Sequence, residues 1–483
     1  MRCDHTIHHR VFQVTVTRRL RVTRGALVLL ALSCLAGCGL TTPPPLSAPQ
    51  PLRELPADFR HAALLKPAAE RVAVARNWWT LYGDDALNAL QQRLPDGNQN
   101  LAASVAQVRI AQAAIDASRA ALYPGAGVGL SATRNDSSTT SIGPSLSVNW
   151  ELDLFGRLSQ QVDVARARLE ANEFDLEALR LSLQATLTQT WLSLRAVQTQ
   201  SALFDDTVQA YQRSLQMTQD RYRVGIVPAT DVAQAQTQLK SAQAQVAELS
   251  GSRALLENAL AVLVGEMPAA VSVSAARGLP EPPEVPLQLP AELLRRRPDI
   301  AAAEKRAVAA AAQVGVTATA FFPTLTLGAS SSLRASTLAD LIAVPPLAWT
   351  IGPSLALAAF DGGARRAAVD SARATLEQAS AQYRQTVLSA MQEVEDNLAL
   401  NAALRRQSEL LAESLIEARR ALELTLNQYR AGTVSYLNVV AAQTTALSVE
   451  RSLLDARSRR LTATNQLLKN LAGGWGRPGT FSP

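Results

Sequence analysis

Hydrophobic positions with helical spacing dominate the middle of the chain. Residues 157–224 form a run of sixty-eight residues without Gly or Pro. Its apolar positions recur at intervals of three, four and seven, which is the spacing of one helix face, at Leu169, Leu176, Leu179, Leu183, Leu187, Leu194 and Val197. One unbroken helix of this length would extend roughly 100 Å, because each residue adds about 1.5 Å. Residues 364–431 form a second run of sixty-eight residues without Gly or Pro and predict another such helix.

Two stretches between the helical runs alternate between apolar and small polar residues, which is the period of a β-strand. The first covers about residues 124–152, where Val128 and Leu130 stand between glycines and serines, and the second covers about residues 323–360. Each stretch predicts two strands of about ten residues. Such strands suit a hairpin of a membrane β-barrel, apolar outside and polar inside, and they equally suit the edge of a soluble sheet.

The chain contains an internal duplication. Tyr222-Arg223-Val224-Gly225 recurs as Tyr429-Arg430-Ala431-Gly432, 207 residues later, each time at the end of a long helical run. In each half, the two shorter helical runs together match the long run in length. Two short helices stacked end to end should therefore lie along a long helix, with both hairpins at one end and both Tyr-Arg-x-Gly turns at the other. We predict a first repeat over residues 78–267, a Pro-rich linker over 268–292, a second repeat over 293–475 and a tail over 476–483.

The number of predicted strands limits what one chain can do in a membrane. A sheet with open edges leaves backbone groups unpaired in lipid, so a spanning sheet must close. Single-chain barrels have at least about eight strands, whereas each chain here supplies four. A membrane role therefore requires several copies of the chain.

Residues 1–37 have the features of a leader peptide. Six Arg lie before Gly25, and residues 26–35 are an apolar run too short to span a membrane as a helix. The following Leu35-Ala36-Gly37-Cys38 resembles the lipobox of bacterial lipoproteins, so we predict cleavage before Cys38 and lipid attachment to Cys38. The alternative is an ordinary secretory signal that happens to precede a Cys. Residues 38–77, rich in Pro and Ala, predict an extended tether.

Removing the leader changes the charge and leaves few reactive residues. Lys+Arg falls from 47 to 41 and Asp+Glu from 41 to 40, so the net charge falls from +6 to about +1. A nucleic-acid partner therefore loses its support. Cys38 and His61 are the only Cys and His that remain, so we expect no disulfide, no metal site and no cofactor. The sequence has neither a nucleophile elbow nor a phosphate-binding loop, and we expect no enzyme activity.

Two charged motifs are interpreted as structural. Glu393, Glu395 and Asp396 lie on a predicted helix, where sequence neighbours do not share a face, so we expect a solvated surface and not a carboxylate pair. Arg295-Arg296-Arg297 stands just before a predicted helix start, and we expect it to pack within the structure and not to bind an anionic ligand.

Several motifs occur together. They are Trp150-Glu151-Leu152-Asp153-Leu154-Phe155-Gly156, Leu294-Arg295-Arg296-Arg297-Pro298-Asp299-Ile300, Phe360-Asp361-Gly362-Gly363, Leu471-Ala472-Gly473-Gly474-Trp475, the lipobox and both Tyr-Arg-x-Gly turns. In this combination the chain resembles the TolC/OprM outer-membrane factor family, in its lipoprotein (NodT-type) branch, over residues 78–475. The resemblance implies a mainly α fold with a transmembrane β-barrel: a homotrimer with four strands per chain, twelve in all, and a long α-helical barrel in the periplasm. It also implies the exit duct of a tripartite efflux pump in the outer membrane, with a periplasmic adaptor and an inner-membrane transporter such as an RND pump as partners.

The resemblance further implies a gate where the helix tips close the periplasmic end. Tyr429 and Asp231 match the positions of a link between helix pairs, which would be a charge-assisted hydrogen bond from a phenol to a carboxylate. Separate capping and packing roles for the two residues are the alternative. Leu437 matches an apolar constriction, whereas Asn438 and Ala441 stand where relatives carry acidic residues. We therefore expect a gate that is more apolar than usual.

The helix tips are also where the adaptor is expected to dock. The two turns supply Tyr222, Arg223, Gly225, Arg430 and Gly432. The alternative function is a lipid-anchored coiled-coil spacer of the cell envelope, which would not need four alternating strand segments. The exported substrate does not follow from the sequence, because a passive duct selects weakly.

Overall fold

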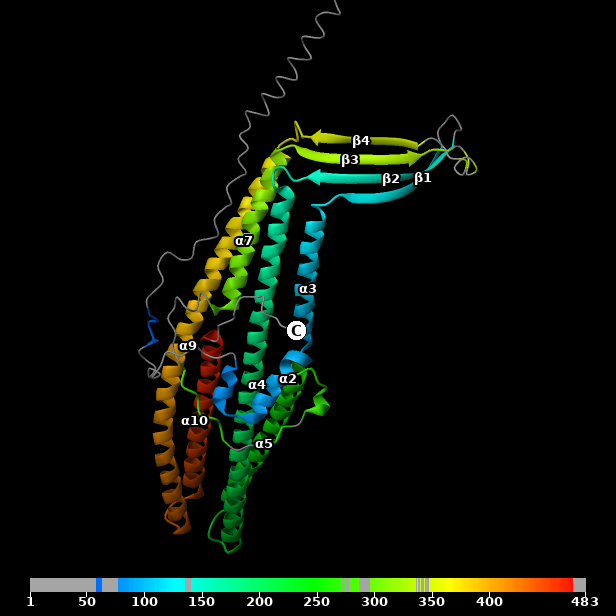
Figure 1. Cartoon of the computed structure of the whole chain (residues 1–483). Coiled ribbons are helices and arrows are strands. Elements are labelled where there is room, and N and C mark those ends of the chain that lie inside the picture. Colours follow the sequence, from blue (N-terminus) through cyan, green and yellow to red (C-terminus); the bar gives the residue numbers. More distant parts are fainter. Residues whose placement is uncertain are drawn as a thin grey trace, which may run out of the picture. The chain divides into compact units, whose positions relative to one another are not determined.

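The computed structural model describes residues 58–62, 77–134, 140–271, 273–274, 278–285, 296–335, 337, 339, 343 and 347–471. All of these residues fall within the unit Leu46–Pro483. Helices account for most of them, and four strands form one sheet (Figure 1). Among the helices of the described ranges, none combines the length and the apolar character needed to cross a membrane.

The two long helices are α4 (Arg157–Arg223) and α9 (Ala364–Arg430), each of 67 residues, as predicted. Each follows a glycine with positive φ, which leads the chain out of the sheet into the helix: Gly156 at 71° and Gly363 at 92°. The Asp153 carboxylate accepts hydrogen bonds from the backbone N–H of Leu158 and Ser159 at 2.9 and 2.8 Å. The Leu-Asp-Leu-Phe-Gly motif therefore builds a helix start.

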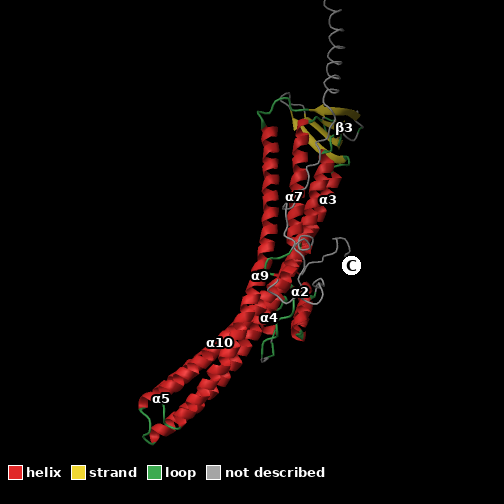
Figure 2. Cartoon of the chain, turned by 90° about the vertical axis from the view of Figure 1, so that its left-hand side faces the viewer, coloured by secondary structure: helices red, strands yellow, loops and turns green. Residues whose placement is uncertain are grey.

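The shorter helices stack end to end beside the long ones, which confirms the prediction from length (Figures 1 and 2). Helices α3 (Gln99–Ala120) and α5 (Ala229–Leu263) contact α4. Helices α7 (Pro298–Ala318) and α10 (Tyr436–Leu471) each contact both α4 and α9. Helix α10 begins at Tyr436, after a turn in which the Thr433 backbone N–H donates to the Gln428 carbonyl at 3.0 Å.

The sheet lies beyond the upper ends of α3, α4, α7 and α9 (Figure 1). Its antiparallel strands have the order β1-β2-β3-β4 and are β1 (Gly125–Arg134), β2 (Thr140–Leu152), β3 (Thr324–Leu333) and β4 (Leu347–Ala356). The register places small polar or glycine residues side by side across all four strands, as in the row Gly127, Ser147, Ser330 and Thr350. The next row is apolar, with Ala126, Val148, Ala329 and Ile351. The two faces of the sheet therefore differ in polarity, as the alternation predicted.

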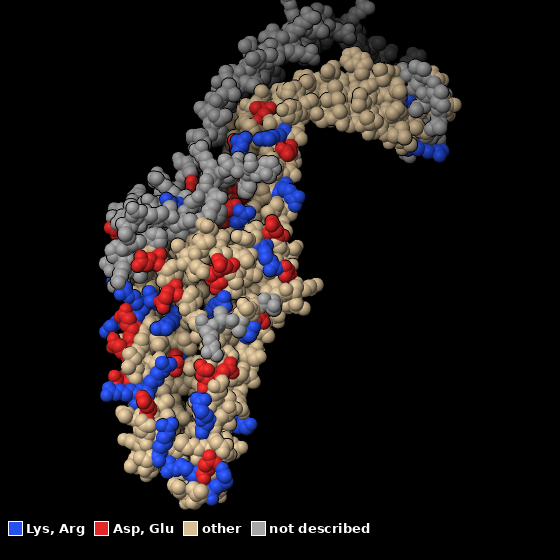
Figure 3. Space-filling view, turned by 60° about the horizontal axis from the view of Figure 1, so that its bottom comes forward, with Lys and Arg blue, Asp and Glu red and all other residues tan. Residues whose placement is uncertain are grey.

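Charged side chains are distributed differently over the helices and over the sheet. Figure 3 shows both signs mixed over the helices and few charges over the sheet. Glu151 lies in the row of Thr326 and Ser354, on the polar face of the sheet, and its carboxylate pairs with Arg157, with 2.7 Å between Oε2 and Nη2.

A belt of buried side chains surrounds the middle of α4 and α9. It joins them to η2 (Trp78–Tyr82), α2 (Asp85–Gly97) and the linker that contains η3 (Pro268–Ala270). The Asp84 carboxylate caps α2 and also accepts from Trp191 Nε1 at 2.9 Å and Arg195 Nη2 at 3.1 Å. Burial alone would raise the pKa of Asp84, yet these hydrogen bonds and the Arg195 charge outweigh it and lower the pKa.

A short 3₁₀ turn, η4 (Thr319–Phe321), follows helix α7 and leads to strand β3.

Helix α2 contains a proline near its end. It continues through Pro95 to Gly97, although a proline has no backbone N–H to donate. Pro95 fits in the last turn because the next free donor, the Asn98 backbone N–H, still reaches the Leu94 carbonyl at 3.1 Å.

The charged motifs near the belt have structural roles. Arg297 is buried and bonds Asp299 at 2.7 Å and Glu393 at 3.0 Å. Glu393 and Asp396 are exposed, as expected for a solvated helix surface, whereas Glu395 is only half-exposed. The Glu395 carboxylate accepts from the His61 ring at 2.8 Å and from the backbone N–H of Arg60 and His61. Glu393 and Glu395 therefore have separate partners and do not form a carboxylate pair.

Candidate functional site

The tips of the two long helices carry the same turn twice. Gly225 and Gly432 adopt φ of 76° and 77°, a left-handed conformation that other residues rarely adopt. The Gly225 N–H donates to the Tyr222 carbonyl at 2.9 Å, and the Gly432 N–H donates to the Tyr429 carbonyl at 3.0 Å. The repeated Tyr-Arg-x-Gly motif therefore encodes a tight link from α4 to α5 and from α9 to α10.

A pair of tyrosines fills the space between the two helix hairpins near their tips. Tyr429 and Tyr436 are both buried, and their ring centroids lie 5.4 Å apart. They form one cluster with Ala235 of α5 and Val439 of α10. The Tyr436 hydroxyl also contacts the Ser214 hydroxyl of α4 at 3.1 Å. Tyr436 thereby ties the second hairpin to the first.

Arg221 of α4 makes the second tie between the hairpins. Its Nη1 donates to the Tyr429 carbonyl at 2.5 Å. Its guanidinium also lies over the Tyr429 ring, 4.8 Å from the centroid, which is a cation–π distance. The carbonyl and the ring of one residue on α9 are thus both held by one side chain of α4.

The hydrogen bond expected between Tyr429 and Asp231 is not formed. The Tyr429 hydroxyl is buried without any hydrogen-bond partner. Asp231 lies in the first turn of α5, where burial raises the pKa of its carboxyl. Tyr429 packs in the buried cluster and Asp231 stands at the start of α5, which are the separate roles that the sequence left as the alternative. The contacts between the hairpins are made by Arg221 and Tyr436.

A sequence signal for Arg221 exists within the duplication. The residue 207 positions after Arg221 is Gln428, so the two turns differ at this place and agree at the tyrosine and glycine that follow. Val224 and Ala431 also differ between the two turns, so the difference points to a role of Arg221 only together with the structure. Tyr429, whose carbonyl and ring contact Arg221, lies on the other hairpin, so this partner could not be deduced from local spacing.

The other candidate gate residues lie on the exposed face of α10 at the same tip. Leu437 is 59 % exposed, and Asn438 and Ala441 are exposed beside it. Tyr436 and Val439, on the opposite side of α10, are buried in the cluster. Leu437, Asn438 and Ala441 therefore form one uncharged, exposed surface at the tip.

The candidate docking residues are accessible. Tyr222 is 49 % exposed, and Arg223 forms an ion pair with Asp220 of its own helix. Arg430 is exposed and bonds Asn427 at 3.1 Å. Both arginines are held by the helix from which they project, so neither bridges the hairpins as Arg221 does.

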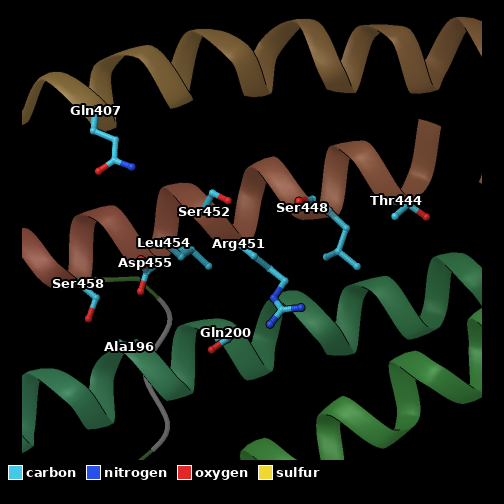
Figure 4. A pocket seen from close by; sticks show the side chains of 11 residues that line it. Ala196, Gln200, Gln407, Thr444, Ser448, Arg451, Ser452, Leu454, Asp455 and Ser458 are labelled. Carbon is cyan, nitrogen blue, oxygen red and sulfur yellow. The ribbon is translucent and has the colours of Figure 1, made fainter. Parts of the chain in front are cut away.

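A groove of about 670 Å³ runs along α10, lined also by α4 and α9 (Figure 4). Its lining is mainly hydroxyl and amide side chains, including Gln200, Gln407, Thr444, Ser448, Ser452 and Ser458. Leu437, Ala441, Ser448 and Asp455 follow at intervals of four, seven and seven, which places them on one face of α10. The groove therefore continues the exposed face of the tip.

Comparison with known proteins agrees with this architecture. The family model described as outer membrane efflux protein matches residues 90–266 and 289–474. The chain is 32% identical over 461 residues to the pyoverdine export outer membrane protein OpmQ of Pseudomonas aeruginosa, covering 91% of this chain and 95% of that one.

Solved structures show the same fold. The outer-membrane channel OprN has a TM-score of 0.79 and 28% identity, with 89% of this chain and 99% of that chain covered. The open state of the MtrE outer membrane channel of Neisseria gonorrhoeae has a TM-score of 0.76 and 25% identity, with 89% and 98% covered. Because the family model spans most of both repeats, this chain belongs to the outer membrane efflux protein family.

Proposed function

We propose that this chain is the exit duct of a tripartite efflux pump, which carries substrates from a periplasmic adaptor and an inner-membrane transporter across the outer membrane. The observation that carries the proposal is the four-stranded sheet. One of its faces is apolar and the other is lined by Gly, Ser and Thr, and its outer strands β1 and β4 each have one neighbour in the chain. Three copies joined from β1 to β4 would close twelve strands around a polar lumen.

We infer that the gate lies at the tips of α9 and α10. Leu437, Asn438 and Ala441 would line the constriction, since they share the exposed face of α10. Tyr429 belongs to the same tip and Asp231 to the tip of the first hairpin, and both would support the gate without lining it. Because the three lining residues are uncharged, charge selectivity at the constriction should be weak. The hydroxyl-lined groove above them suits a duct that does not hold its cargo tightly.

We further infer that the adaptor docks at the two turns. Tyr222, Arg223 and Arg430 project from the tips, and the close turns at Gly225 and Gly432 leave room for another helix end. An inner-membrane transporter such as an RND pump would supply the energy, because the described residues form a passive wall.

The remaining assignments concern the two ends of the chain and the linker. Cys38 and the leader 1–37 lie outside the described residues, as does most of the tether 38–77 and the whole tail 476–483. We retain cleavage before Cys38, a lipid on Cys38 and the linker 268–292 between the repeats as proposals that rest on the sequence.

The decisive experiment combines size and conductance. The protein, solubilised in detergent, should sediment as a trimer and form ion-conducting pores in planar bilayers. A monomer that conducts ions would contradict the proposal. A trimer that never conducts would favour the alternative of a lipid-anchored structural spacer.

A further inference from the structure

A second cavity, of about 250 Å³, lies in the belt between the linker and the hairpin of α9 and α10. The linker contributes residues 279–282, α9 contributes Arg405, Ser408 and Glu409, and α10 contributes Arg457 and Arg460. Arginine is therefore the commonest charged residue of this wall. Glu409 pairs with Arg405 at 3.2 Å and with Arg406 at 3.4 Å, so Glu281 is the one other carboxylate that lines the cavity beside Arg457 and Arg460.

Arg460 is incompletely satisfied in this cavity. Its Nε is buried and has no hydrogen-bond partner. Burial, followed by the positive charge of Arg405, lowers the pKa of Arg460, and the opposing effects of Glu281 and Glu409 do not compensate. A buried N–H donor without an acceptor is costly, because it has lost its hydration without gaining a hydrogen bond.

The first repeat shows how the same position is normally satisfied. The repeats correspond at an offset of 207 residues along both helix pairs, so Arg253 is the counterpart of Arg460 and Gln198 is the counterpart of Arg405. Arg253 bonds Glu257 at 2.8 Å and the Val273 carbonyl of the linker at 2.9 Å. The first repeat therefore provides this arginine with two oxygen acceptors.

The second repeat differs from the first around this arginine. Thr464 replaces Glu257, so the carboxylate one turn further along the helix is lost. Arg405 replaces Gln198, which in the first repeat donates to the Ser274 carbonyl of the linker at 3.4 Å. Arg457 adds a third cation at a position that Ser250 occupies in the first repeat. Among the described residues, Arg460 Nε therefore has no acceptor, and a cavity lies beside its side chain.

We propose that this cavity binds a small oxyanion, either a phosphate or a carboxylate. The guanidinium groups of Arg460 and Arg457 project from α10 one turn apart, and their N–H groups suit the paired oxygens of such a ligand. Ser408 lines the same space from α9. The bound anion would lie between the linker and the second hairpin, where the linker carbonyls of Val273 and Ser274 contact Arg253 and Gln198 in the first repeat. This site is independent of the duct and of its gate.

The test is isothermal titration calorimetry on the full-length protein in detergent, at constant ionic strength. One titration uses inorganic phosphate and the other uses acetate, which separates the two sources of oxyanion. Saturable binding of either ion to the wild type is expected. Arg460→Gln should weaken it by about tenfold or more, because a hydrogen bond between charged groups is removed. Arg457→Gln should weaken binding in the same direction and, as an exposed residue, should leave folding intact.

Arg459→Gln is the matched control. Arg459 stands next to Arg460 but is exposed and pairs with Asp455, so binding by this variant should equal that of the wild type. Absence of saturable binding to the wild type would overturn the proposal. So would equal binding by the wild type, Arg460→Gln and Arg457→Gln, since the ion would then occupy another place.

Discussion

Replacing Arg221 by Gln tests whether the helix hairpins are tied as the structure indicates. The change removes the 2.5 Å hydrogen bond to the Tyr429 carbonyl and the guanidinium that lies 4.8 Å from the Tyr429 ring centroid. The contact between the Tyr436 and Ser214 hydroxyls remains. The second hairpin should therefore be held less firmly at its tip, while the rest of α9 and α10 stays packed.

The magnitude follows from the two contacts. A hydrogen bond from a charged donor contributes about 1.5–3 kcal/mol, with the lower end appropriate because Arg221 is only half-buried. A partly exposed cation–π contact adds about 0.5–1 kcal/mol. The loss is then about 2 kcal/mol per chain and about 6 kcal/mol if three tips open together. Since 1.4 kcal/mol is a factor of ten, the ratio of open to closed trimers should rise by about four orders of magnitude.

Single-channel recording in planar bilayers measures this shift. Arg221→Gln should increase the open probability and the mean conductance. Arg221→Lys should have a smaller effect, because lysine keeps the positive charge but lacks the planar guanidinium group. Arg223→Gln is the control, since Arg223 pairs with Asp220 within α4 and does not reach the second hairpin. If Arg221→Gln and Arg223→Gln conduct alike, at the wild-type level, the tie between hairpins does not hold the tip closed.

Three further predictions concern other parts of the chain. Tyr429→Phe should leave conductance unchanged and keep or slightly increase the unfolding free energy, because its hydroxyl is buried without a partner; a rise in conductance would restore the bond to Asp231 inferred from the sequence. Asp84→Asn should lower the urea midpoint of unfolding by the equivalent of about 1–3 kcal/mol. Because the folded pKa of Asp84 is lowered, its contribution is complete above the unfolded pKa of about 4 and should fade as the pH falls through the folded pKa; unfolding curves of the variant and the wild type that stay equally far apart down to acid pH would contradict this. Cys38→Ser should abolish acyl labelling in a membrane fraction, and unchanged labelling would exclude Cys38 as the attachment site.

The sequence by itself determined the elements and their order. Helical spacing without Gly or Pro was sufficient to predict α4 and α9, because the periodicity of side chains is a local property of the chain. The alternation of Val128 and Leu130 with small residues likewise predicted which face of the sheet is apolar. The stacking of short helices along long ones followed from length alone, since rise per residue is constant. Family motifs then identified the assembly.

The tertiary structure decided which side chains meet. Tyr429 and Asp231 are correctly located at the helix tips, but the partner of Tyr429 is Arg221, on a helix 208 residues away in sequence. Glu393 and Glu395 lie on the helix as predicted, yet each found a partner far along the chain. Arg460 Nε lacks a hydrogen-bond acceptor, whereas its counterpart Arg253 bonds a linker carbonyl, and this difference depends on the tertiary structure. Periodicity predicts the face from which a side chain projects, whereas its contacts depend on how separate helices pack, and that packing is set by the whole fold.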